Sequence, residues 1–111
     1  MIKVPLKPLS VNNAYQGRRF STPEKNKFTK ACDALIRAGK VPDGKLRIDF
    51  EFGFSNKAQD VDGPIKVCLD VLQKRFDFND NRVYELTARK VIVPKGQEYW
   101  AFEITAICEE K

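Results

Sequence analysis

The sequence predicts a single α+β domain in which a mixed β-sheet packs with two helices. Apolar and other residues alternate over 46–54 with the period of a strand. Apolar residues recur at three- and four-residue spacing over 28–36 and 65–76, the period of a helix with one buried face. The chain has 111 residues, 42% of them hydrophobic, which is enough for one core. It is far below the ~250 residues at which cores usually divide.

The first half of the chain is expected to supply two strands and one helix. Residues 2–6 alternate apolar residues with lysine or proline, which favours a short strand at the edge of the sheet. A polar loop follows over 8–19. Ser-Thr-Pro-Glu at 21–24 is typical of a helix start, and Gly39 is expected to end that helix. The alternating segment 46–54 is then the strongest strand in the sequence.

The second half is expected to supply one helix and two strands. Gly63 and Pro64 stand before the helical segment that ends at Phe76. After a polar connection, residues 83–93 read as a strand, Pro-Lys-Gly-Gln forms a turn, and residues 100–108 alternate as the final strand. The predicted order is therefore β-α-β-α-β-β.

Composition limits the chemistry that the chain can perform. The sequence contains no histidine, which excludes catalytic systems based on Ser-His or Cys-His pairs and metal sites that need imidazole. Catalysis must then rely on carboxylates, lysine, tyrosine, thiol or a metal held by oxygen atoms. The formal net charge of +5 and the isoelectric point near 9.2 favour a polyanionic partner.

The cysteines and the N-terminal segment indicate a cytoplasmic protein. Cys32, Cys68 and Cys108 are an odd number, lie far apart and fall among apolar residues, so they are expected to be buried, reduced thiols. The N-terminal residues carry lysines and no apolar run typical of a signal peptide. No uncharged apolar run approaches the ~18 residues that a membrane span needs, so no membrane partner is expected.

Asp60 and Asp62 are the first candidate metal ligands. They lie two residues apart at the expected end of a strand, where extended backbone points both side chains to the same side. Two adjacent carboxylates repel each other unless a cation lies between them, and Mg²⁺ or Mn²⁺ prefers such oxygen ligands. The alternative is that Asp62 only caps the helix that begins at Pro64. The pair alone does not decide between these interpretations.

Asp80 is the third candidate carboxylate. It lies in the loop after the second helix, between Asn79 and Asn81, where an aspartate commonly serves only the turn. The next strand begins at Val83. If that strand runs beside the strand that precedes Asp60, Asp80 is expected to reach the same ion.

Lys66 is the candidate cation of the same site. It follows Asp62 by four residues, and a helical side chain leans toward the N-terminus of its helix, where phosphate groups bind favourably. The alternative is a solvated lysine that pairs with Asp70 one turn later.

Several motifs carry a resemblance to a known family. They are PLSVNNAY at 8–15, DVDGPIK at 60–66, CLDVL at 68–72 and NDNRV at 79–83. Two aspartates separated by one residue, a lysine four residues after the second, and an aspartate eighteen residues after it form a combined pattern. With these motifs the sequence resembles, over nearly its whole length, the RusA family of Holliday-junction resolvases, the crossover junction endodeoxyribonucleases of phages, prophages and bacteria.

The resemblance implies a RusA-like endonuclease domain and fold over residues 1–111. Members of the family are dimeric, Mg²⁺-dependent endonucleases that cut four-way DNA junctions by symmetric paired nicks, in DNA recombination and repair. Carried over to this chain, the catalytic, metal-binding aspartates correspond to Asp60, Asp62 and Asp80, and the essential lysine corresponds to Lys66. The expected cofactor is Mg²⁺, with Mn²⁺ as a substitute and no small-molecule cofactor.

Branched DNA and a second copy of the chain are the expected partners. The chain has eight phenylalanines, five of them at 50, 52, 54, 76 and 78, which is more than one small core obviously needs, so some are expected at a homodimer interface. Two other functions remain open, a branched-DNA binding module without catalysis and a nuclease for other branched or flapped DNA.

The residues expected to contact DNA lie in four places: the N-terminal loop, the loop before Asp60, the end of the second helix and the segment just before the strand at 83–93. They are Asn12, Asn13, Tyr15, Arg18, Arg19, Lys57, Lys74 and Arg82.

Overall fold

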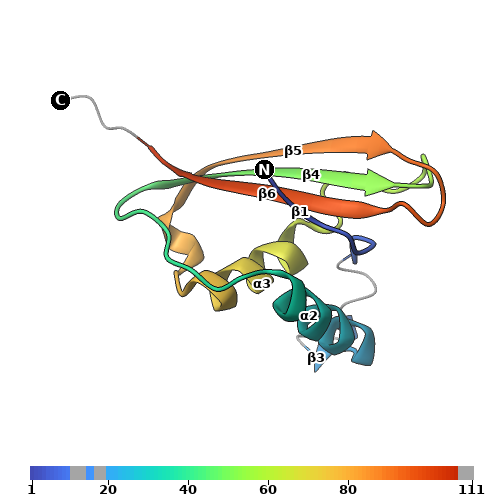
Figure 1. Cartoon of the computed structure of the whole chain (residues 1–111), viewed down its shortest axis with the longest axis horizontal. Coiled ribbons are helices and arrows are strands. Elements are labelled where there is room, and N and C mark those ends of the chain that lie inside the picture. The colour runs from blue at the N-terminus through green and yellow to red at the C-terminus, as the bar shows by residue number, and fades with distance from the viewer. Residues whose placement is uncertain (11–14, 17–19, 108–111) are drawn as a thin grey trace.

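The computed structural model describes residues 1–10, 15–16 and 20–107, and it places two helices against one face of a four-stranded sheet (Figure 1). The predicted α+β class with a mixed sheet and two helices is confirmed. The strands lie in the order β1-β6-β4-β5. The main elements are β1 (Ile2–Val4), α2 (Pro23–Leu35), β4 (Leu46–Phe54), α3 (Ile65–Phe76), β5 (Val83–Ile92) and β6 (Tyr99–Ala106).

Three short elements add to the predicted order. A two-stranded hairpin of β2 (Tyr15–Gln16) and β3 (Phe20–Ser21) lies within the segment predicted as a polar loop and the helix start that follows it. One turn of 3-10 helix, η1 (Asp80–Arg82), lies directly before β5. All three are too short to leave a periodic pattern in the sequence.

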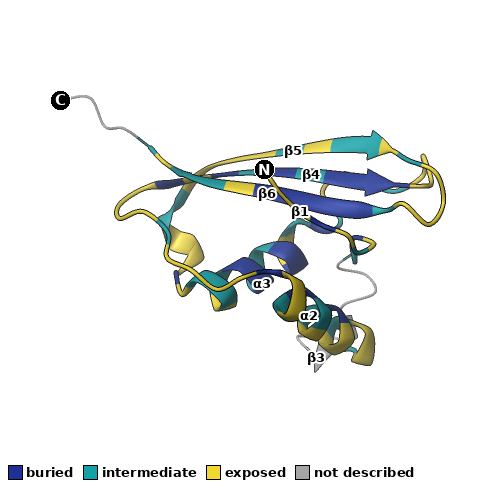
Figure 2. Cartoon of the chain, viewed as in Figure 1, coloured by how far each residue is buried: buried dark blue, intermediate teal, exposed yellow. Residues whose placement is uncertain are grey.

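Strand β4 is the centre of the sheet. It pairs antiparallel with β6 on one side and parallel with β5 on the other. Its apolar residues face the helices and are at most 3% exposed, and Figure 2 shows this buried band running along β4 and β6. Because parallel neighbours need a crossover connection, α3 carries the chain from β4 to β5 across the helical face.

Most of these phenylalanines pack in this core. Phe50, Phe52, Phe54 and Phe78 are at most 8% exposed, and the half-buried ring of Phe76 packs edge-on against Phe102 with ring centroids 5.8 Å apart. These four buried rings fill the core of the single chain, and the expectation that some phenylalanines lie at a dimer interface stays a prediction for the others. The exposed large apolar residues of the sheet lie instead on β1 and β5: Ile2, Tyr84, Leu86 and Ile92.

Helix α2 begins as predicted and ends early. The hydroxyl of Thr22 accepts a hydrogen bond from the backbone N–H of Lys25 at 3.2 Å, which caps the helix. At the other end Ile36 is extended and 2% exposed, because its side chain turns into the core. The helix therefore stops at Leu35, before Gly39, and Leu35 is 51% exposed rather than part of the buried stripe.

The thiols behave as predicted where they are described. Cys32 and Cys68 are free and buried, and burial raises the pKa of Cys32 to about 12 and that of Cys68 well above its ordinary value. Cys108 lies outside the described residues. No helix in the described part of the chain is long and apolar enough to cross a membrane.

The face of the sheet opposite the helices carries a network of charges. Arg47 of β4 pairs with Glu85 of β5 at 3.2 Å, and Glu51 of β4 pairs with Arg89 of β5. Glu51 also accepts a hydrogen bond from the hydroxyl of Tyr99 at 2.6 Å. This bond lowers the pKa of Glu51 and, together with burial, raises the pKa of Tyr99 to about 12.

Candidate functional site

Asp60 and Asp62 lie in a turn between β4 and α3. The loop before them is held by Lys90 of β5, whose ammonium group donates to the carbonyl oxygens of Lys57 and Gln59 at 2.6 Å each. The prediction of extended backbone at Asp60 and Asp62 is wrong, since β4 ends six residues before Asp60 and the chain then turns. The loop is nevertheless fixed, because Lys90 ties it to the end of the sheet.

The turn leaves both carboxylates available. Its backbone closes through two hydrogen bonds, from Gly63 N–H to the backbone carbonyl oxygen of Asp60 and from Ile65 N–H to that of Asp62, each 3.2 Å long. The N-cap of α3 is Pro64, and no side chain caps the helix, so the alternative role of Asp62 as a cap is not adopted. Both aspartates are exposed, and neither carboxylate makes a hydrogen bond or ion pair with the described residues.

A groove opens beside this turn. It has a volume of about 350 Å³ and lies between the chain after β1 and the first half of α2. Gln59 lines it on the side of the turn, and a Cβ atom at Gly63 would lie 3.4 Å from Ser10, so the two segments are neighbours. Two lysines from distant parts of the sequence, Lys7 and Lys27, line the same groove. No sequence pattern links them, and only the fold brings them together.

Lys66 lies in the first turn of α3 and is exposed. The unpaired backbone N–H groups of a helix start and its dipole favour anions, and a lysine adds a full positive charge there. Asp70, the alternative partner of Lys66, lies 3.6 Å from Lys25 of α2. The start of α3 therefore combines two carboxylates, a lysine and a site that favours anions within one short segment.

Asp80 lies at the opposite end of α3. Its backbone N–H donates to the side-chain oxygen of Gln73 in the last turn of that helix at 2.9 Å. The side chain of Asn79 accepts a hydrogen bond from the N–H of Asn81, also at 2.9 Å, and so caps η1. The carboxylate of Asp80 is exposed and makes no hydrogen bond or ion pair with the described residues.

The direction of β5 explains this separation. The expectation that β5 runs beside β4 is confirmed, but the pairing is parallel, with Leu46 opposite Val83 and Phe54 opposite Ile92. Asp80, just before β5, therefore lies near the start of β4. Asp60 comes after the end of β4 and lies at the opposite end of the sheet. The 12 residues of α3 add about 18 Å along its axis. Within one chain Asp80 does not reach Asp60 and Asp62, and the described residues hold no cluster of three metal-binding side chains.

The predicted DNA-binding residues fall into three groups. Arg82 is structural, because its guanidinium group donates to the carbonyl oxygens of Gly44, at 3.1 Å, and Pro42. Lys57 and Lys74 are exposed, on the loop before Asp60 and in the last turn of α3. The backbone of Tyr15 is in β2, and the remaining predictions lie outside the described residues: Asn12, Asn13, Arg18 and Arg19.

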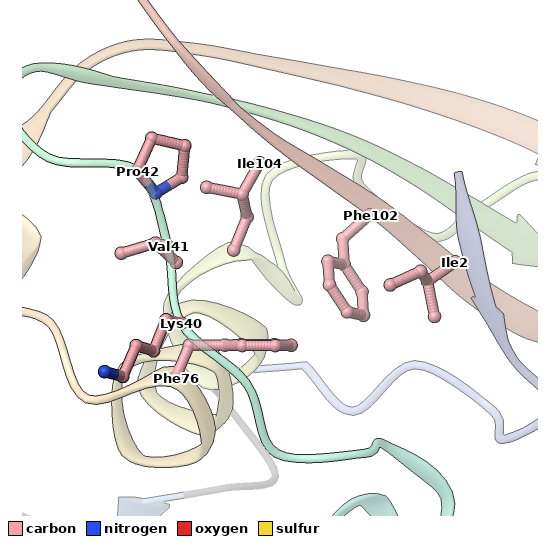
Figure 3. Close-up of a pocket in the computed structure, with 7 residues that line it drawn as sticks. All are labelled: Ile2, Lys40, Val41, Pro42, Phe76, Phe102 and Ile104. Atoms are coloured by element: carbon pink, nitrogen blue, oxygen red, sulfur yellow. The ribbon is translucent and has the colours of Figure 1, made fainter.

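The Asp80 end of α3 carries a different kind of hollow. Figure 3 shows Val41, Phe102 and Ile104 turned toward the ring of Phe76, around a cavity of about 170 Å³. Most of its lining is apolar, and the ammonium group of Lys40 points away from it (Figure 3). Among the residues that line it, this hollow offers no set of convergent polar groups.

Lys90 is a site residue that the sequence analysis missed. It lies opposite Phe52 on the helical face of β5, among positions whose other residues are apolar. A lysine at an inward position of an alternating strand is a signal that its ammonium group has a partner.

Comparisons with known proteins do not assign the chain to a family: no model of a protein family matches it, and no similar curated protein was found.

Proposed function

We propose that the protein is a divalent metal-dependent endonuclease that resolves four-way DNA junctions by paired nicks. The observation that carries the proposal is the turn at the start of α3, where Asp60 and Asp62 are exposed and do not cap the helix. The resemblance of DVDGPIK and NDNRV to the RusA family supplies the reaction and the substrate. The net charge of +5 supports a polyanionic partner.

The donor set at this turn fits Mg²⁺ or Mn²⁺. Mg²⁺ is commonly held by one or two carboxylates and keeps its other positions for water and substrate phosphate oxygens. Asp60 and Asp62 provide two such carboxylates, and no cation among the described residues neutralises them. When bound, the ion supplies charge stabilisation and an activated water for phosphodiester hydrolysis.

The residues of the chain have separate roles in this proposal. Asp60 and Asp62 hold the ion, and Lys90 keeps their loop in place through the two carbonyl oxygens that it binds. Lys66 and the start of α3 bind the scissile phosphate and stabilise its negative charge. The groove next to the turn is lined by Lys7, Lys27 and Glu24, and its net positive charge contacts the DNA backbone.

The substrate is tested with strand-labelled four-way, three-way, flapped and linear DNA, incubated with the protein in Mg²⁺ or EDTA and analysed on a denaturing gel. The proposal predicts paired, symmetric nicks in the four-way junction, in Mg²⁺ only. Stronger cutting of flapped DNA would instead indicate a nuclease for other branched structures. A gel shift of the four-way junction in EDTA without cutting in Mg²⁺ would indicate a binding module.

A further inference from the structure

We infer that a hollow between α2 and α3, away from the turn of Asp60 and Asp62, binds the phosphate backbone of a duplex DNA arm. The inference deepens the proposed function and rests on it for the choice of DNA as the polyanion. Three features carry it: the lysines that line the hollow, the distribution of lysine along α2, and the groove on the other side of that helix.

The hollow is lined by cationic and polar side chains. It has a volume of about 260 Å³, and its lining residues are Lys25, Asn26, Thr29, Lys30 and Lys74. Lysines from two helices therefore meet at one place, and no carboxylate is among the lining residues. Like charges that line one hollow repel each other and favour an anion bound between them. The amide of Asn26 and the hydroxyl of Thr29 add neutral hydrogen-bond donors of the kind that phosphate oxygens accept from.

Two of the three lysines are available to a ligand. Lys30 and Lys74 are exposed, and neither makes a hydrogen bond or ion pair with the described residues. Lys25 is half-buried and lies 3.6 Å from Asp70, an ion pair that links α2 to α3 beside the hollow. Arg75, next to Lys74, serves the fold instead, because its guanidinium group donates to a backbone oxygen just after α2 at 2.5 Å. The hollow therefore combines a braced pair of helices with two cations that have no partner in the described part of the chain.

The distribution of lysine along α2 does not serve the stability of the helix. Lysine is favourable near the C-terminus of a helix, where it interacts with the negative end of the helix dipole. The lysines of α2 (Pro23–Leu35) all lie at or before residue 30, and the last turn holds no basic residue. Positive charge concentrated on one part of a surface is typical of a site that binds a polyanion.

Helix α2 separates this hollow from the groove beside the candidate metal turn. Lys27 of α2 lines that groove together with Lys7. Lys25 and Lys30 of the same part of α2 line the hollow, together with Lys74 of α3. The two helices pack side by side (Figure 1). The lysines therefore form a band that crosses the N-terminal part of α2 and leads from the turn to the last turn of α3.

The spacing along α3 predicts which phosphate the hollow binds. Lys74 follows Ile65 by nine residues, so it lies about 14 Å along the helix axis from the first residue of α3. Successive phosphates of one strand are about 3.4 Å apart along a duplex, so a backbone that runs along α3 brings a phosphate about four nucleotides from the cut to the hollow. No aromatic or apolar residue lines the hollow, and phosphate contacts carry no sequence information, so arms of any sequence are expected to bind.

The affinity for a four-way junction in EDTA tests this surface without cleavage. Lys30→Gln/Lys74→Gln is expected to bind about 10-fold more weakly than the wild type at about 100 mM salt, and to reduce the slope of log affinity against log salt by about 2, because two phosphate contacts are lost. Lys30→Arg/Lys74→Arg keeps both charges and should bind like the wild type. Lys40→Gln/Lys95→Gln is the matched control, since it removes the same charge from exposed lysines that do not line the hollow. Equal affinities of the two glutamine variants would overturn the inference.

The position of the bound phosphate is tested with junctions in which one phosphate at a time is replaced by an uncharged methylphosphonate. The wild type is expected to lose affinity when the replaced phosphate lies about four nucleotides from the cut, and Lys30→Gln/Lys74→Gln should show no further loss there. The same loss in both proteins at every position would contradict the assignment of the hollow to a backbone phosphate.

A DNA arm and a free anion are distinguished by calorimetric titration with inorganic phosphate. Phosphate binding that Lys30→Gln/Lys74→Gln abolishes, together with unchanged junction affinity, would indicate a site for a free anion and overturn the choice of DNA. Equal junction affinities with cleavage intact would overturn this surface and leave the proposed function standing. A junction that binds through these lysines and is not cut in Mg²⁺ would overturn the proposed endonuclease and leave the surface standing.

Discussion

The two ends of helix α3 carry similar residues that are used differently. Exposed aspartates lie at both ends: Asp60 and Asp62 in the turn before the helix, and Asp80 in the segment after it. At the finish the neighbours are engaged in local structure: Gln73 binds the backbone of Asp80, and Arg82 binds two carbonyl oxygens of the turn before β4. At the start the loop is held in a similar way by Lys90, but there two exposed carboxylates, Lys66 and a groove occur together.

The difference shows why motif spacing alone does not define a site. All three aspartates belong to one pattern in the sequence, yet parallel pairing of β4 and β5 places them at opposite ends of helix α3. The start of α3 has the properties of a ligand site, namely available carboxylates, a lysine and a groove beside them. The end of α3 lies at the opposite end of the parallel pair and does not contribute to that site within one chain.

Replacing an aspartate at the start of α3 is expected to have the largest effect. Asp62→Asn removes a negative ligand oxygen and should lower the rate of junction cleavage at least ~100-fold without changing stability, because the side chain is exposed. Asp70→Asn is the control, since it removes the same charge from α3, the helix that follows Asp62, where Asp70 pairs with Lys25. Single-turnover cleavage and urea denaturation measure both. A similar loss in the two variants would mean that charge, rather than position, accounts for the effect.

Lys66→Ala should have the next largest effect on cleavage. Loss of a cation beside the scissile phosphate is expected to cost about 10- to 100-fold in rate, corresponding to about 1.4–2.7 kcal/mol. Lys95→Ala removes the same charge from an exposed turn before β6 and should change the rate less than about twofold. Equal rates for the two variants at saturating DNA would show that Lys66 contributes only to the overall charge.

At the other end of the helix, Arg82→Ala should alter stability. The guanidinium group binds two backbone carbonyl oxygens, so its loss is expected to lower the free energy of unfolding by about 1–2 kcal/mol. Arg37→Ala is the matched control, because Arg37 is exposed and makes no hydrogen bond or ion pair with the described residues. Urea denaturation compares the two, and equal midpoints would mean that the turn before β4 does not need Arg82.

The smallest effect concerns the face of the sheet away from α3. Tyr99 has its pKa raised from 10.0 to about 12, so its bond to Glu51 stabilises the fold below pH 10 and this contribution disappears as the pH rises toward about 12. Tyr99→Phe should cost about 1 kcal/mol at neutral pH. The difference between wild type and variant should shrink over that alkaline range. A constant difference would show that the hydroxyl does not depend on Glu51.

Much of the fold follows from the sequence because its strongest patterns are local. The alternation of β4, the cap at Thr22 and the stripe of α3 all predict the element that the structure contains. The end of α2 is not local, since Ile36 leaves the helix to enter the core. The exposure of Leu35 follows from the same early exit.

The candidate site was predicted only in part, for a similar reason. The segment of Asp60, Asp62 and Lys66 is contiguous, so one motif is enough to identify it. The location of Asp80 depends on the direction in which β5 pairs, and Lys90 and the groove lysines depend on the packing of distant segments. Spacing along the chain carries no information about these arrangements.

Direct binding of Mn²⁺ tests the central claim, that the start of α3 holds a divalent ion. Electron paramagnetic resonance of free Mn²⁺ during titration compares the wild-type protein with the double variant Asp60→Asn/Asp62→Asn. The account predicts saturable binding by the wild type and at least ~10-fold weaker binding by the variant. Equal affinity in the two proteins would contradict the claim, and these aspartates would then be residues of a turn and no more.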